Sequence, residues 1–160
     1  MTTTPEHSAT TNELYAVLSP QLRTELAKHE RPATVPGGTK LIRREVLPEQ
    51  LVIVNSGKVE IAFAGMRNSV SLGSTAGKVF GMRAMVSGEL PEIDVTCVEP
   101  CCITTFPRDV FLALLKTNPE IYFAVAKVLS ADLQIANRVL RNCSRRRSPS
   151  TFRFSQAKPD

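Results

Sequence analysis

A row of short, regularly spaced β-prone runs between residues 33 and 106 constrains the fold more than any other feature. Turn-forming segments separate the runs, such as Pro36-Gly37-Gly38 and Asn55-Ser56-Gly57. Runs this short predict an antiparallel β-roll or jelly roll rather than a parallel sheet. The runs cover residues 40–43, 51–55, 59–63, 70–72, 95–98 and 103–106.

Helical patterns flank the β-prone region and complete a mainly β fold with helices at both ends. Apolar residues recur every three or four positions over residues 14–29, and Ser19-Pro20 divides this stretch into two predicted helices. Residues 84–86 have room for one helical turn, and residues 111–115 for a short helix. Asn118-Pro119-Glu120 then opens a long helix that is predicted to end near Arg141.

The long helix carries two apolar stripes. One stripe alternates steps of four and three residues, as a coiled-coil seam does, while the other lies on a neighbouring face. We predict that the second stripe packs on the β-roll and that the first forms a homodimer interface. A single wide stripe packed inside a monomer is the alternative. The predicted interface consists of Ala126, Leu129, Leu133, Ala136 and Leu140.

Length and charge predict one domain between two tails. The 160 residues carry a net charge of +5, but residues 138–160 hold seven basic side chains and one acidic one. We expect a disordered N-terminus over residues 1–12, a domain over residues 13–141 and a basic, disordered tail over residues 142–160. The tail is either a solvated segment or a sequence-independent contact for nucleic acid or an acidic partner.

The features that the sequence lacks predict the cellular compartment of the protein and the absence of catalytic activity. No apolar run approaches the roughly 20 residues of a membrane helix, and no secretory signal begins the chain, so a cytoplasmic protein without membrane contact is expected. The four cysteines lack zinc-site spacing, and no nucleophile–base set or metal-binding pair of carboxylates stands out. We expect neither an enzyme nor a metal site.

Residues 79–95 resemble the phosphate-binding cassette of cyclic-nucleotide-binding domains, the sensor fold of the bacterial catabolite activator (CRP/FNR) family. The shared frame is Phe80-Gly81, then Ala84, then Ser87-Gly88-Glu89. Three further segments resemble the family in the right order, so that the resemblance spans about residues 18–140. They are a hairpin with a Ser-Gly turn at 51–61, a Pro-x-Gly turn at 36–38 and a strand-to-helix link at 106–111.

The resemblance implies a ligand site whose polar groups are replaced in this chain. In the family, a Glu after Phe-Gly holds the ribose hydroxyl, and an Arg neutralises the cyclic phosphate with paired donors. Met82 stands at the Glu position and Pro91 at the Arg position, while Glu92 follows where the family has a small hydroxyl residue. We therefore expect no tight binding of cyclic AMP or cyclic GMP and no firm cofactor. The family-equivalent ligand positions are Phe80, Gly81, Met82, Arg83, Ala84, Pro91, Glu92 and Asn137.

Two residues offer a way to rebuild the site. Arg83 stands beside the lost Glu and would meet an anion by turning inward, or else it is a solvent-facing residue of the short helix. Asn137 matches a position where some relatives contact the base, or else it is an ordinary polar residue of the long helix. A nearby loop also departs from the family, because Arg44-Glu45-Val46 stands where Glu-Gly-Asp is common.

Three functions follow from these patterns. The first is a stand-alone, dimeric regulatory sensor that binds an atypical small ligand, or none, and signals by moving the long helix. The second is a dimeric scaffold that binds a protein partner and has lost sensing. The third is a nucleic-acid accessory protein that works through its tail. Sequence-specific DNA reading is not expected, because the residues after Asn142 are too few for a helix-turn-helix domain.

Overall fold

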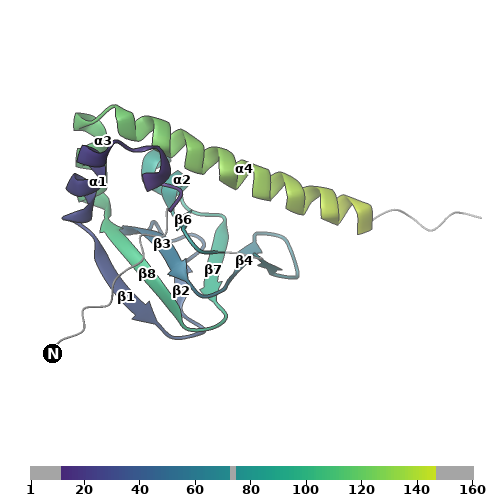
Figure 1. Cartoon of the computed structure of the whole chain (residues 1–160). Helices are drawn as coiled ribbons and strands as arrows, with labels where there is room; N and C mark the ends of the chain where they lie inside the picture. Colours follow the sequence, from purple (N-terminus) through teal and green to yellow (C-terminus); the bar gives the residue numbers. More distant parts are fainter. Residues whose placement is uncertain (1–11, 73–74, 147–160) are drawn as a thin grey trace, which may run out of the picture.

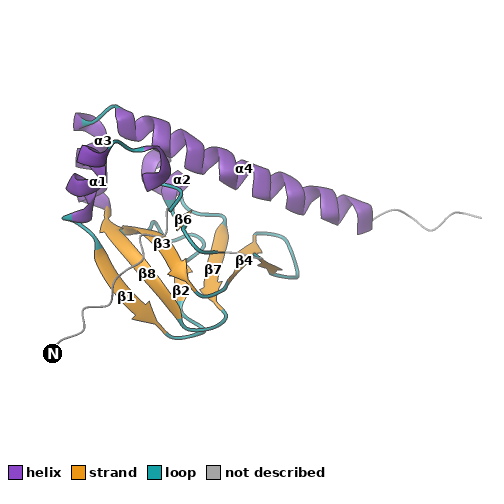
Figure 2. Ribbon diagram, viewed as in Figure 1, coloured by secondary structure: helices purple, strands orange, loops and turns teal. Residues whose placement is uncertain are grey.

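The computed structural model describes residues 12–72 and 75–146, which form a β-roll with helices packed on one side (Figures 1 and 2). Two four-stranded antiparallel sheets face each other, as the short runs predict. One sheet has the order β1 (Arg31–Val35), β8 (Cys101–Pro107), β3 (Gln50–Ser56), β6 (Lys78–Phe80). The other has the order β2 (Lys40–Ile42), β7 (Ile93–Cys97), β4 (Val59–Phe63), β5 (Val70–Ser71).

The first sheet is covered on both faces, and the continuous apolar sequence of β3 reflects this. Leu51 to Val54 are four consecutive buried apolar residues, since successive side chains of a strand point to opposite faces. Leu51 and Ile53 join the core under the helices, whereas Val52 and Val54 join the core between the two sheets. The inter-sheet core also buries Cys97 and Cys101 as small apolar residues, while Cys102 is exposed.

The helices form a layer over the outer face of the first sheet. A 3-10 turn, η1 (Tyr15–Val17), precedes α1 (Pro20–Ala27), and the Ser19 side chain accepts a bond from Leu22 N at the start of α1. The predicted break at Ser19-Pro20 is thus confirmed. The short helix α2 (Met82–Ser87) lies within the β region, and α3 (Arg108–Thr117) leads into α4 (Glu120–Arg146), which extends beyond the roll (Figure 1).

The structure contains two strands that the sequence patterns did not indicate. β1 has five residues, four of them exposed, and includes Pro32, which suits its place at the edge of its sheet. β6 pairs with β3 and leads into the cassette. It has only three residues, which is too short for a recognisable alternation of apolar and polar side chains.

Several predicted boundaries were wrong by a few residues. The helix predicted at 111–115 begins at Arg108, directly after Pro107, and the long helix continues to Arg146 instead of ending near Arg141. The Asn118 side chain donates to the Leu114 carbonyl at 3.1 Å. This hydrogen bond caps the C-terminus of α3, whereas the sequence predicted that Asn118 caps the N-terminus of α4. Asn12, expected in a disordered tail, is buried and accepts a bond from Tyr15 N at 2.8 Å. The rest of both predicted tails, residues 1–11 and 147–160, lies outside the described residues.

Candidate functional site

The cassette is a strand–turn–helix unit held by two glycines. β6 ends at Phe80, Gly81 turns the chain with φ of 90°, and α2 follows at once. Gly88 closes α2 with φ of 73° and donates its N–H to the Ala84 carbonyl at 2.9 Å. Positive φ is strained for other residues, and a Cβ at position 81 would lie 3.2 Å from Ile42 Cδ1. Gly81 and Gly88 are therefore required at these positions by the backbone conformation of the cassette.

Met82 is a core residue. Its side chain is fully buried and belongs, with that of Met85, to the cluster under the helices, which also contains Val79 of β6. Thioether side chains fill irregular gaps in cores, and here two of them anchor α2. The position at which the resemblance predicts a ribose-binding Glu is thus occupied by an apolar packing group.

Arg83 and Glu89 form an ion pair at the surface of the cassette. The Arg83 guanidinium donates to Glu89 Oε2 at 2.7 Å, and the two side chains are 53% and 65% exposed. Exposed pairs of this kind contribute little stability, about 0–1 kcal/mol. Arg83 is therefore charged and accessible but is already engaged within the cassette.

The end of the cassette is tied to two loops through its backbone. Pro91 is buried, and its carbonyl accepts the Glu45 N–H at 3.0 Å, while the Glu92 carbonyl accepts the Ala64 N–H at 3.0 Å. The Glu92 side chain is exposed. Glu45 has φ of 61°, so it adopts the left-handed conformation that usually favours glycine.

Asp94, two residues past Glu92, fixes the same loop by its side chain. It accepts the Arg44 backbone N–H at 2.9 Å and the Arg44 guanidinium at 3.0 Å, and Lys40 Nζ lies 3.6 Å away. These hydrogen bonds from Arg44, with the positive charge of Lys40 nearby, hold the pKa of Asp94 below its usual value. The sequence patterns did not single out this carboxylate, because its partners Arg44 and Lys40 lie 50 or more residues away in the sequence.

A second charge cluster, also missed from the sequence, joins the cassette to α4. Lys78, three residues before Gly81, is 8% exposed, and its Nζ contacts Glu13 Oε1 at 3.1 Å and Asp132 Oδ1 of α4 at 3.2 Å. Glu13 Oε2 also accepts the Val79 N–H at 3.3 Å. Burial raises the pKa of Asp132, an effect that the nearby Lys78 opposes. We call Glu13, Lys78 and Asp132 the charge triad; it links three segments that are distant in sequence.

The family-equivalent ligand positions fall into two groups in the structure. Phe80, Met82, Ala84 and Pro91 are buried, and Gly81 is partly buried between them. Arg83, Glu92 and Asn137 are exposed, and Asn137 lies on α4.

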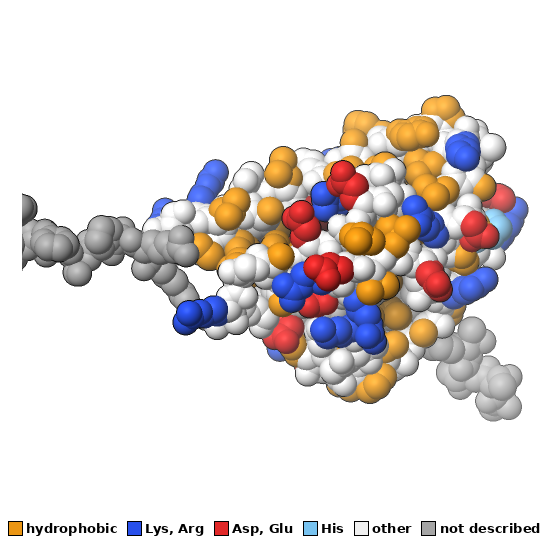
Figure 3. All heavy atoms as spheres, turned by 180° about the vertical axis from the view of Figure 1, so that it is seen from behind, with side chains coloured by type: hydrophobic (Ala, Val, Ile, Leu, Met, Phe, Trp, Pro, Cys, Tyr) orange, Lys and Arg blue, Asp and Glu red, His pale blue; other side chains and the backbone are white. Residues whose placement is uncertain are grey.

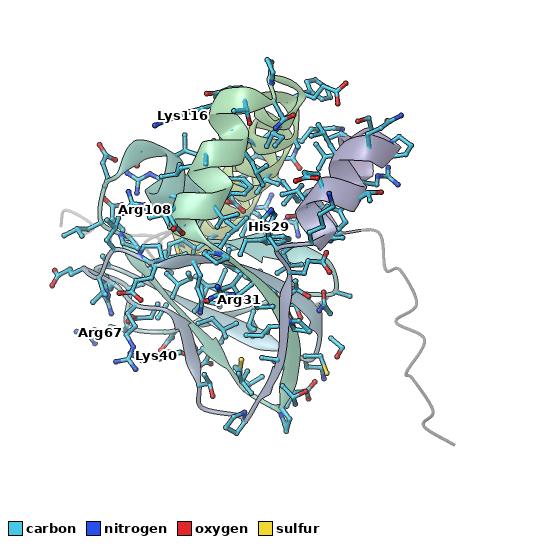
Figure 4. All side chains as sticks on the ribbon, turned by 90° about the vertical axis from the view of Figure 1, so that its left-hand side faces the viewer. His29, Arg31, Lys40, Arg67, Arg108 and Lys116 are labelled. Atoms are coloured by element: carbon cyan, nitrogen blue, oxygen red, sulfur yellow. The ribbon has the colours of Figure 1, made fainter. Side chains whose placement is uncertain are left out.

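Arg108, at the start of α3, is a further charged residue beside the cassette (Figure 4). Its Nη2 would lie 3.9 Å from a Cβ at Gly88, the residue that ends α2. A cation at a helix C-terminus is favourable, so Arg108 has a structural reason for its place.

Two classes of feature are absent from the described part of the chain. In residues 12–72 and 75–146, no group of three or more His, Cys, Asp or Glu side chains is arranged to hold a metal ion. Over the same residues, no helix combines the length and the apolar character needed to span a bilayer.

Solved structures with the same fold come from several bacteria. Catabolite Activator Protein from Thermus thermophilus is 21% identical, with a TM-score of 0.67 over 83% of this chain and 63% of that one. The sensor domain of the transcriptional regulator DNR from Pseudomonas aeruginosa is 20% identical, with a TM-score of 0.59 over 76% of this chain and 88% of that one. The chain thus spans less than two thirds of the Thermus protein.

An enzyme also contains this fold. A cAMP-binding acyltransferase from Mycobacterium smegmatis is 22% identical, with a TM-score of 0.56 over 74% of this chain and 37% of that one. A search of curated proteins finds no match. The family model of the cyclic nucleotide-binding domain matches residues 32–118, more than half of the sequence. Together with the β-roll, the glycine-framed cassette and the long helix, this match shows that the chain belongs to the cyclic nucleotide-binding domain family, with the fold of catabolite-activator-type sensors.

Proposed function

We infer that the chain is a regulatory sensor domain whose cassette binds an atypical small ligand, or none, and binds cyclic AMP and cyclic GMP only weakly. The burial of Met82 in the helical core carries this inference, because the family's ribose-holding Glu has no counterpart there. Pro91 offers neither a charge nor a donor at the position of the phosphate-binding Arg. Losing one partner of a buried charged hydrogen bond costs about 2–5 kcal/mol, or roughly one to four decades in affinity.

The charge triad supports a route by which the cassette affects α4. Lys78 lies on the strand that enters the cassette, and Asp132 lies halfway along α4. A ligand that shifts β6 would change the Lys78–Asp132 contact, whereas a ligand that binds both arrangements equally would change nothing. The output would be a new position or stability of the outer part of α4.

The outer stripe of α4 supports a homodimer as the form in which this output is read. Leu133 and Leu140 are 62% and 63% exposed, and the spacing of the other predicted interface residues places them on the same helix face. Ala126 and Ala136 are small, which permits close approach of a second helix at these positions.

A scaffold without sensing is the second candidate, favoured by one observation. Met82, Met85 and Pro91 are all buried, as expected if the cassette has become part of the core. Titration with ligands separates the two candidates.

The test is a calorimetric titration of the protein with cyclic AMP and with cyclic GMP. We expect no binding at micromolar ligand. A variant with both Pro91→Arg and Glu92→Ser restores the family's phosphate contacts at the end of the cassette, and we expect it to bind at least tenfold more tightly than the unmodified protein. A sensor would also show slower hydrogen exchange in α4 when the variant is loaded, whereas a scaffold would not. Micromolar binding by the unmodified chain would contradict the proposal.

A further inference from the structure

The second half of α4 has a third face, which neither the β-roll nor the predicted dimer uses. We call it the basic face; it consists of Gln134, Asn137, Arg138, Arg141, Asn142 and Arg145, all exposed. The three arginines follow a spacing of three and four residues, so they lie above one another along about 10 Å of the helix.

The helical period separates the basic face from both apolar stripes. The residues that pack on the body, such as Val128 and Val139, define one direction, and the predicted interface residues, such as Leu133 and Leu140, define a second. At about 100° per residue, Arg138 and Arg145 point roughly 100° away from the first direction and roughly 140° away from the second. The basic face therefore remains open to solvent even when the dimer seam is occupied.

The charge of this face is not neutralised nearby. Residues 133–145 contain no Asp or Glu, and the last acid before them, Asp132, already contacts Lys78. Among the residues that the structure describes, no carboxylate forms an ion pair with Arg138, Arg141 or Arg145. Figure 3 shows basic side chains near the free end of α4, beyond the mixed charges of the body.

A shallow, open hollow lies between the side chains of the same face. Its volume is about 430 Å³, and all six residues of the basic face line it. Its lining combines arginines with side-chain amides and includes no apolar residue.

This combination suits the backbone of nucleic acid. Arginine binds phosphate oxygens with two parallel donors, and Asn and Gln side chains bond to phosphates, sugars and base edges. A single helix also fits the major groove of B-DNA, which is about 12 Å wide, but not the narrow major groove of RNA helices. A membrane surface would require apolar side chains on the contacting face, and the basic face has none.

We propose that the basic face of α4 binds the phosphate backbone of double-stranded DNA without sequence preference. The three arginines replace counterions on the duplex, so affinity falls with salt by about 0.9 logarithmic units per phosphate contact for each unit of log salt concentration. Three contacts per chain give a slope of about −2.7, and a dimer that engages both faces gives about twice that value. The proposal does not depend on what the cassette binds.

The test measures fluorescence anisotropy of labelled 20-base-pair duplexes of two unrelated sequences, with the full chain at 50 and 200 mM salt. We expect micromolar binding at 50 mM salt, equal for both duplexes. The variant Arg138→Gln, Arg141→Gln, Arg145→Gln is expected to weaken binding at least tenfold and to flatten the salt slope. Glutamine is a good helix former, and circular dichroism checks that α4 persists.

The matched control removes three exposed arginines from the β-roll and its loops: Arg31→Gln, Arg43→Gln, Arg67→Gln (Figure 4 labels Arg31 and Arg67). It has the same net charge as the α4 variant and is expected to bind DNA within about twofold of the unmodified chain. An equal loss in the control would show that net charge alone causes binding. Absence of binding at 50 mM salt would also overturn the proposal, as would equally effective competition by poly-glutamate at the same charge concentration.

Discussion

The two halves of α4 have similar apolar content but different surroundings. In the first half, Ile121, Ala124 and Val128 are fully buried under the domain's own core. In the second half, Leu133 and Leu140 are more than 60% exposed, and Val139 is the residue that stays buried among those described after Asp132. The β-roll is shorter than α4, so the domain's own core covers only the first half of the helix. A continuous apolar pattern in a helix therefore does not show whether the domain itself or a partner covers it.

The boundary between the halves coincides with the charge triad. Asp132 is the last residue of α4 that contacts β6 through its side chain in the hydrogen bonds of the described residues. The body thus contacts α4 closely up to Asp132. Beyond Asp132, Val139 alone is buried among the described residues, so the stability of this part of the helix depends more on its own propensity and on a partner.

The largest effect is expected from shortening a side chain in the first half. Ile121→Ala leaves a cavity in a core with no exposed surface, and we expect a loss of about 2–4 kcal/mol in the free energy of unfolding. Leu133→Ala in the second half should change it by no more than about 0.5 kcal/mol in the monomer. Urea unfolding at a concentration where the protein is monomeric measures both. Equal losses would mean that the body covers both halves.

A smaller effect is expected at the boundary. Lys78→Met leaves the Glu13 and Asp132 carboxylates without their cation, and breaking a buried pair costs about 3–5 kcal/mol. Since the two carboxylate side chains are 31% and 39% exposed, water offsets part of this, and we expect about 1–3 kcal/mol.

Hydrogen exchange tells this boundary role apart from a general loss of stability. In Lys78→Met, exchange should accelerate in α4 after residue 129 more than in the first half of the helix. Lys58→Met, which removes an exposed lysine from the β3–β4 turn, is the control and should leave α4 unchanged. Uniform acceleration along α4 would argue against a boundary at the triad.

The third prediction concerns the open stripe of the second half. Leu133→Glu places a charge in the predicted seam and should raise the dimer dissociation constant at least tenfold, with little change in monomer stability. Gln134→Glu adds the same charge to an exposed position on the basic face of α4, outside the seam, so it should leave the constant within about threefold. Sedimentation equilibrium measures both. A monomeric unmodified protein at millimolar concentration would show that the seam prediction is wrong.

The β-roll was largely predictable because its signals are local. The runs at 51–55 and 59–63 became β3 and β4 nearly unchanged, since a continuous apolar run in β3, alternating burial at the start of β4 and the Ser56-Gly57 turn between them are all signals within a dozen residues. Gly57 has φ of 100°, and a Cβ there would lie 2.6 Å from Cys101 Sγ, so the turn tolerates little else. β1 was missed because an exposed edge strand with a proline has no apolar alternation to detect.

The cassette was predictable in position but not in environment. The family frame located Gly81 and α2 correctly. That Met82 points into the core under the helices, and that Arg83 pairs with Glu89, depends on packing that no short motif records.

By itself, the sequence determined much of the local structure: the Ser56-Gly57 turn, the break at Ser19-Pro20, six of the strands, and the two apolar stripes of α4. Only the tertiary structure decided which stripe the domain buries, and that Glu13, Lys78 and Asp132 meet although more than fifty residues separate each from the next. The physical reason is the range of the interactions. Turns and periodicity arise from neighbours along the chain, whereas burial and charge pairing arise from segments that become neighbours only when the chain has folded.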